Sequence, residues 1–149
     1  SCKYPEGVRE NGMYCHGAQW LIKAARILAE RFENQGDSVK ADEYREAAYR
    51  LWLKITPVSH VTPGQIEIYG GQPNKQAADL FTTFDQGRMI WNGYTGAAGW
   101  MFRESLEGVV GAALINNKIV LPGDINKPRG ELKVNSIHRD ISKSPLKAT

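Results

Sequence analysis

Cysteine is scarce in this sequence, with only Cys2 and Cys15 among 149 residues. Two cysteines cannot form the multi-bridge framework of small secreted domains, and neither has a partner at the spacing of a metal site. We therefore expect two free thiols, which are typical of a reducing compartment, and a cytoplasmic location. We also expect no metal ion and no cofactor.

Long hydrophobic runs and a strong charge of one sign are also missing. No apolar run approaches the ~20 residues of a membrane span, and no basic, apolar and small-residue series marks a signal peptide. The net charge is +3, and residues 118–149 alone carry seven Lys/Arg against three Asp/Glu. Because the excess lies in this tail, we read it as solvated surface and predict no membrane and no nucleic-acid partner.

Helical periodicity is the strongest pattern in the first third of the chain. Apolar residues recur at i, i+3, i+4 and i+7 over residues 15–33, and Gly36 ends this pattern. The same spacing recurs over residues 37–56. Asp37 or Ser38 caps the second helix and Pro57 ends it. The spacing predicts two amphipathic helices that are joined tightly enough to pack antiparallel.

Residues 57–86 are polar and repeatedly broken by proline and glycine, with one short strand expected at 65–69. A loop of this length is usually functional or disordered, and its aromatic residues disfavour disorder. We therefore predict an ordered segment that runs beside residues 87–96. Both segments are expected to face the same cleft as His16.

The period changes after a third predicted helix, which follows Thr95. Residues 112–121 read as a hairpin around Asn116-Asn117, and alternation between 132 and 137 indicates another strand. Helices first and strands last suggest a helical body followed by a β layer. Three helices and three short strands do not close an independent fold, so we expect the chain to be part of a longer protein.

The stretch 87–101 carries the clearest chemical pattern, with Gly93, Gly96 and Gly99 among aromatic residues. A Thr95-Gly96 step that opens a helix leaves N–H donors pointing outward at the positive end of the helix dipole, which suits an anion. Aromatic rings beside it suit sugar faces. The alternative is a glycine-rich turn that only lets the helix pack tightly against its neighbour.

The other candidate groups each have a structural alternative. His16 lies near a helix start, where a histidine is usually a cap or a packing residue, and Glu10 could simply pair with Arg9. Asp79 and Asp85 flank residues 81–84, and either could be a general acid or an ordinary cap. The sequence contains no P-loop, dinucleotide fingerprint or nucleophile elbow.

Two segments together resemble the inverting glycoside phosphorylases of glycoside hydrolase family 94. They are Tyr-Pro-Glu-Gly-Val-Arg-Glu-Asn-Gly-Met-Tyr-Cys-His (4–16) and Trp-Asn-Gly-Tyr-Thr-Gly-Ala-Ala-Gly-Trp (91–100). The resemblance implies a mainly α fold. Residues 1–111 would form the C-terminal portion of an (α/α)6 barrel, and residues 112–149 a C-terminal β segment and tail.

The resemblance also implies which residues bind. His16, Thr95 and Gly96 would hold phosphate, and Arg9 and Glu10 would contact the sugar. The family's catalytic aspartate lies upstream of any segment present, so no catalytic residue is assigned and the chain alone is expected to be inactive. The complete enzyme is expected to be a homodimer with oligosaccharide and phosphate as its partners.

The implied reaction is phosphorolysis of a β-glucoside to α-glucose 1-phosphate, with phosphate as a substrate. Residues 69–79 and 84–91 look most like the cellobionic acid branch, which would release gluconate. The alternatives are a cellobiose, cellodextrin or β-1,2-glucan phosphorylase, or a non-catalytic carbohydrate-binding or structural module.

Overall fold

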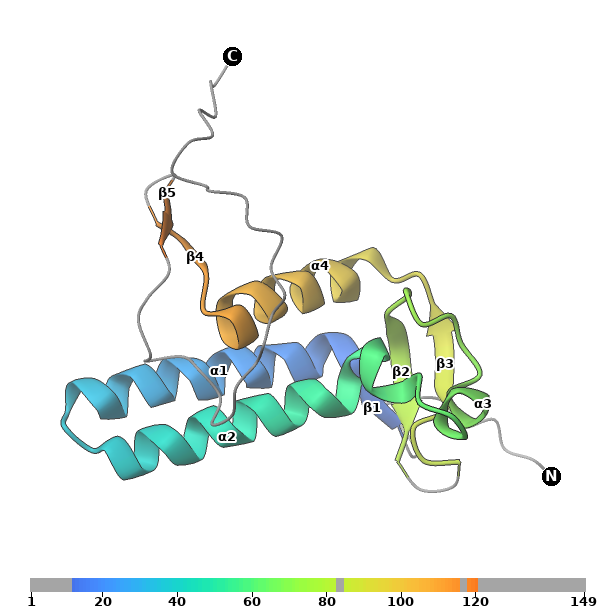
Figure 1. Cartoon of the computed structure of the whole chain (residues 1–149), viewed down its shortest axis with the longest axis horizontal. Helices are drawn as coiled ribbons and strands as arrows, with labels where there is room; N and C mark the ends of the chain where they lie inside the picture. The colour runs from blue at the N-terminus through green and yellow to red at the C-terminus, as the bar shows by residue number, and fades with distance from the viewer. Residues whose placement is uncertain (1–11, 83–84, 116–117, 121–149) are drawn as a thin grey trace, which may run out of the picture.

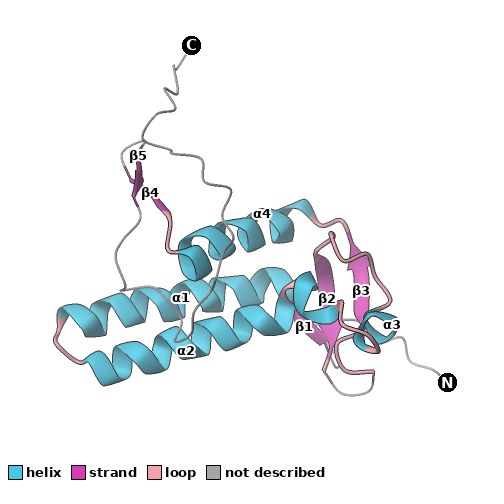
Figure 2. Cartoon of the chain, in the orientation of Figure 1, coloured by secondary structure: helices cyan, strands magenta, loops and turns pink. Residues whose placement is uncertain are grey.

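The computed structural model describes residues 12–82, 85–115 and 118–120 (Figure 1). This part of the chain is mainly helical, as predicted, and also contains a small three-stranded antiparallel sheet that was not predicted (Figure 2). The elements are β1 (Gly12–Tyr14), α1 (Cys15–Asn34), α2 (Ser38–Ile55), η2 (Pro57–His60), α3 (Gln65–Tyr69), β2 (Ala77–Phe81), β3 (Met89–Asn92), α4 (Thr95–Glu104), η3 (Ser105–Val110), β4 (Ala113–Ile115) and β5 (Lys118–Val120).

Helices α1 and α2 form the antiparallel pair that the periodicity predicts (Figure 1). Gly36 makes the turn between them with φ +80°, a conformation that glycine adopts without a steric penalty. The Asp37 carboxylate caps α2 by accepting a hydrogen bond of 3.1 Å from the Lys40 backbone N–H. Small buried side chains, such as those of Ala18, Ala41 and Ala48, let the helices approach closely.

A three-stranded antiparallel sheet lies at the end of the helical pair, in the order β1-β2-β3. Gly12 pairs with Phe81, and Asp79 lies between Tyr14 on one side and Ile90 on the other. No strand was predicted at residues 12–14, where the structure has β1. The strand is only three residues long, which is too short to show a periodic pattern.

The expected strand at 65–69 is also wrong, because these residues form the single helical turn α3. Gly64 and Gly70, with φ +84° and +63°, bound this turn at both ends. The strand in this region is β2, in which all five residues are buried. A strand buried on both faces shows no alternation of polar and apolar residues, so the sequence did not reveal it.

Helix α4 begins at Thr95, as predicted, and continues into the π-helical turn η3. Gly111 ends this turn in the left-handed conformation, a common way for a helix to stop. The predicted hairpin follows, with Ala113 opposite Val120 and Ile115 opposite Lys118. The strand expected between 132 and 137 lies outside the described residues.

Helix α1 packs against both α2 and α4, and the sheet continues directly into α1 at Tyr14 (Figure 1). The buried core lies where these elements meet, and it includes Cys15, Ile22, Ile55, Tyr69 and Leu80. No helix among the described residues combines the length and the hydropathy that crossing a membrane requires.

Candidate functional site

His16 lies in the first turn of α1, directly after the short strand β1. Pairing with β2 fixes β1, and therefore fixes where α1 begins. The His16 ring is flanked by two aromatic side chains, with ring centroids 6.0 Å away at Tyr14 and 5.1 Å away at Trp20. These contacts hold the imidazole in a defined orientation at the start of the helix.

The structure brings His16 and Gly96 together although they are far apart in the sequence. A Cβ atom at position 96 would lie 3.0 Å from Cε1 and 3.4 Å from Nδ1 of the His16 ring. A side chain there would push against the imidazole. Gly96 therefore allows the ring to lie directly against the first turn of α4.

The N-terminus of α4 presents backbone donors beside this histidine. Tyr94 is the N-cap residue, its side chain makes no capping hydrogen bond, and the first turn contains no acidic residue. Thr95 and Gly96 are both exposed. The first N–H groups of a helix have no partner within it and carry a partial positive charge, so the arrangement can accept an anion.

Exposed aromatic side chains accompany these residues in sequence and structure. Tyr14 and Trp20 contact the His16 ring, and Tyr94 precedes α4 directly. Trp91 is exposed and has φ +49°, which is rare for a bulky residue and costs conformational energy. Such strain is found often at functional sites.

The described part of segment 57–86, residues 57–82 and 85–86, lies beside residues 87–92. Strand β2 pairs with β3, the Met89 side chain packs against Gly71, and His60 lies against Gly87. His60 also stacks on Tyr69, with ring centroids 5.1 Å apart. The two segments therefore lie next to each other, as predicted.

Of the two aspartates considered as acids or caps, neither caps a described helix. Asp79 lies in the central strand β2, and burial raises the pKa of its carboxyl. Its Oδ1 atom is buried without a hydrogen-bond partner. Asp85 is exposed in a turn and pairs with Arg88 at 3.1 Å.

Cys15 is a buried free thiol between His16 and the sheet. Burial, with the nearby Asp79 charge, raises its pKa to about 12. The thiol is therefore protonated at neutral pH and is a poor nucleophile. Cys2 lies outside the described residues.

Arg9 and Glu10 also lie outside the described residues, so the structure does not place them. Within the part that is described, no cluster of three or more His, Cys, Asp or Glu side chains could hold a metal ion. Sequence reasoning missed Gln19 and Trp20 as neighbours of the site. Their positions three and four residues after His16 on a helix are the signal that could have found them.

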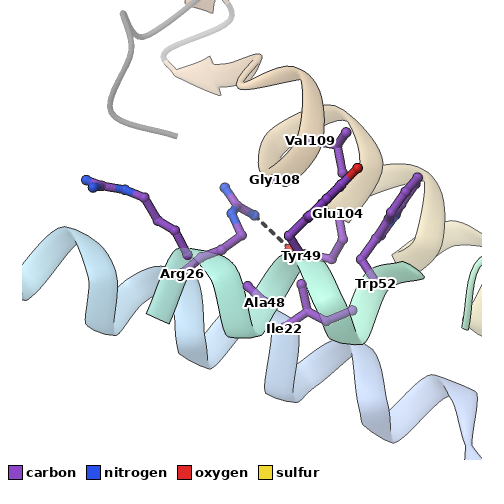
Figure 3. Close-up of a pocket in the computed structure, with 9 residues that line it drawn as sticks. Ile22, Arg26, Ala48, Tyr49, Trp52, Glu104, Gly108 and Val109 are labelled. Carbon is purple, nitrogen blue, oxygen red and sulfur yellow. Dashed lines mark hydrogen bonds and ion pairs between the residues drawn. The ribbon is translucent and has the colours of Figure 1, made fainter. Parts of the chain in front are cut away.

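A separate pocket lies between α1, α2 and the end of α4 (Figure 3). Its volume is about 20 Å³, which is room for about one water molecule rather than for a sugar. Arg26 and Glu104 both line it, and they form an ion pair at 2.7 Å. The lining includes neither His16 nor Gly96, so this pocket is distinct from the site at the start of α4.

Comparison with known proteins gives two matches. The family model described as "Glycosyl hydrolase 94 superfamily, catalytic domain" matches residues 2–111. The chain is also 34% identical over 148 residues to "Cyclic beta-(1,2)-glucan synthase NdvB" of Rhizobium meliloti (strain 1021). That match covers 95% of this chain and 5% of the relative's length.

Proposed function

The chain belongs to the glycosyl hydrolase 94 superfamily, and from this premise we propose that it serves inverting phosphorolysis of a β-glucoside, holding the phosphate and part of the sugar. Family membership supports a phosphorylase-type function in general. The observation that carries the proposal is the contact of His16 with Gly96 at the uncapped start of α4. Because the chain covers only 5% of the relative's length, we propose that it acts within a longer enzyme.

Each group at this site has a separate task in the proposed reaction. The backbone N–H groups at the start of α4 and the Thr95 hydroxyl would donate hydrogen bonds to phosphate oxygens, and the His16 imidazole would donate from the other side. Charge-assisted bonds of this kind are roughly twice as strong as neutral ones. The phosphate would thus be fixed in position for attack.

The chemistry parallels that of an inverting glycosidase, with phosphate replacing the attacking water. Because phosphate is already anionic, it needs positioning and charge stabilisation rather than a general base. An acid must still protonate the leaving oxygen on the opposite side of the sugar. We assign that acid to no residue of this chain.

Two substrates follow from different observations. The resemblance of residues 69–79 and 84–91 favours cellobionic acid, which would give α-glucose 1-phosphate and gluconate. The relative named as a cyclic β-1,2-glucan synthase favours a β-1,2-linked glucan instead. Release of glucose 1-phosphate from each of the two, with cellobiose as a third, distinguishes them.

The decisive experiment compares His16→Ala and Thr95→Val with the unmodified complete enzyme. Loss of a hydrogen bond to a charged group costs about 1.5–3 kcal/mol, so the KM for phosphate should rise roughly 10- to 100-fold. The KM for the sugar should change little. Thr62→Val, which alters an exposed threonine outside this site, is the matched control and should leave both constants unchanged.

Other outcomes would point elsewhere. A rise in sugar KM with an unchanged phosphate KM would assign His16 and Thr95 to the sugar. Sugar binding with no phosphate-dependent turnover in the complete enzyme would support the non-catalytic binding module.

A further inference from the structure

The buried amide of Gln19 connects the two halves of the candidate site. Gln19 lies on α1 with none of its surface exposed. Its Nε2 donates a hydrogen bond of 2.8 Å to the carbonyl oxygen of Ala97, 78 residues further along the chain. Ala97 is itself buried and lies in the first turn of α4.

We propose that Gln19 is a positioning residue, which fixes the first turn of α4 against α1 so that His16 and the N–H groups of α4 act on one phosphate. This inference rests on the proposed function and assigns a residue that the family resemblance does not supply. Gln19 itself would not touch the phosphate.

The geometry explains why this bond controls the site. His16 and Gln19 are three residues apart on α1, so they lie on one face of the helix. Their partners on α4, Gly96 and Ala97, are adjacent. A ring contact alone would let α4 turn about its axis, whereas the adjacent hydrogen bond fixes the rotation as well.

A second contact holds the other end of the same helix. Arg26, seven residues after Gln19, binds Glu104, seven residues after Ala97, at 2.7 Å. Helices α1 and α4 therefore run parallel at this interface, as Figure 1 shows. The ion pair secures the distant end of α4, and Gln19 secures the end that carries the candidate site.

Gln19 does more than fill space. Its Oε1 atom is buried without a hydrogen-bond partner, and an unsatisfied buried polar atom destabilises the fold. An apolar side chain of similar size would pack without that cost. The amide is therefore explained by the directional bond that it donates to Ala97.

The first test is Gln19→Met in the complete enzyme, because methionine keeps the volume and removes the donor. We expect the KM for phosphate to rise about tenfold, with kcat and the sugar KM within twofold of the unmodified enzyme. Glu104→Gln weakens the Arg26–Glu104 ion pair at the other end of α4 and is the matched control. It should lower thermal stability and leave the phosphate KM unchanged.

A second variant, Gln19→Glu, keeps the shape and makes the donor depend on pH. The introduced carboxyl can donate to the Ala97 carbonyl only when it is protonated. Its phosphate KM, divided by that of the unmodified enzyme at the same pH, should therefore rise as the pH increases. Gln19→Met should show no such step.

The outcomes separate this inference from the proposed function. An unchanged phosphate KM in His16→Ala would overturn the proposed function, and the role of Gln19 with it. A raised phosphate KM in His16→Ala, but an unchanged one in both Gln19 variants, would overturn the positioning role alone. Equal rises in the phosphate and sugar KM of Gln19→Met would also overturn it, because they would indicate general structural damage.

Discussion

Among individual residues, Asp79 shows best how burial changes chemistry. Its carboxyl lies in the central strand of the sheet, beside the β1 residue Tyr14 that contacts His16. Burial disfavours the charged form and raises its pKa. The folded chain therefore holds the Asp79 proton at a pH where the unfolded chain has already released it.

The consequence is a stability that falls with rising pH. The unfolded state binds fewer protons than the folded state between the unperturbed carboxyl pKa of about 3.9 and the raised folded pKa, so the free energy of unfolding decreases across that window. Asp79→Asn removes the titrating carboxyl and therefore removes this pH-dependent loss of stability. We expect the variant to unfold at a higher temperature than the unmodified chain at pH 7, with the difference disappearing towards pH 4.

Thermal unfolding followed by fluorescence at several pH values measures this effect. Asp85→Asn is the control, because the Asp85 side chain is exposed. Identical pH dependence for Asp79→Asn and the unmodified chain would show that the Asp79 carboxyl is not destabilised by burial.

At the scale of elements, ion pairs join α1 to α4 and η3. Arg26 binds Glu104 at 2.7 Å and reaches Glu107 at 3.4 Å, and Lys23 binds Glu107 at 2.7 Å. Burial alone would raise the pKa of Glu107, but hydrogen bonds from Lys23 and Arg103 outweigh it and lower the pKa. A network of ion pairs therefore joins α1 to α4 and η3. Of the side chains named in it, Arg26 and Glu104 are the two that are nearly fully buried.

Breaking the buried pair should be costly. Glu104→Ala leaves the Arg26 charge poorly compensated, and removal of one partner of a buried pair typically costs about 3–5 kcal/mol. We expect the lower end of that range, because Glu107 remains within reach. Arg26→Met combined with Glu104→Leu should cost clearly less, since it removes both charges.

Denaturant unfolding of Arg26→Met, of Glu104→Leu and of the double variant gives the coupling free energy, and Glu104→Ala is measured in the same way. Glu46→Ala, which removes an exposed pair with Arg50, is the control and should change stability by less than about 1 kcal/mol. A Glu104→Ala cost as small as that of the control would show that the buried pair does not hold the helices together.

The elements differ in how far the sequence predicted them. Helices α1 and α2 are long enough for the apolar periodicity to predict them. Helix α4 was predicted from the Thr95-Gly96 step at its start. The three-stranded sheet was missed because β1 has three residues and β2 is buried throughout. The error at Gln65–Tyr69 was the opposite one, since a strand was expected where glycines at both ends enclose a helical turn.

The candidate site was predictable in part for the same reason. The helix start at Thr95 followed from local sequence, but the contact of His16 with Gly96 depends on how α4 lies along α1. Local patterns carry no information about that packing. The Gln19–Ala97 bond, which crosses the same interface, could not be predicted from spacing alone.

On the described part of the molecule, several large apolar side chains are exposed to solvent. Leu21 is 63% and Ile27 52% exposed on α1, while Phe102 is 67% exposed on α4. Exposed apolar side chains favour association with other apolar surfaces, because contact removes them from water. We expect the 149-residue chain, expressed alone, to self-associate.

Light scattering coupled to size-exclusion chromatography measures this association as an apparent mass that rises with protein concentration. Leu21→Glu combined with Ile27→Lys should reduce the association, whereas Val58→Lys, outside the α1 and α4 surfaces, should reduce it less. A chain that remains monomeric at all concentrations, with a cooperative thermal transition, would contradict the expectation.

The π-helical turn η3 lies where the chain leaves the helical part. A π-turn accommodates one residue more than a regular α-helical turn, because its hydrogen bonds run from i to i+5. Deleting a single residue within Ser105–Val110 would remove this extra residue and restore regular bonding, so the chain after it would keep nearly the same rotation around the helix axis. A one-residue gap at this place in an alignment would therefore mark relatives that have a regular helical turn here, with α4, β4 and β5 arranged as in this chain.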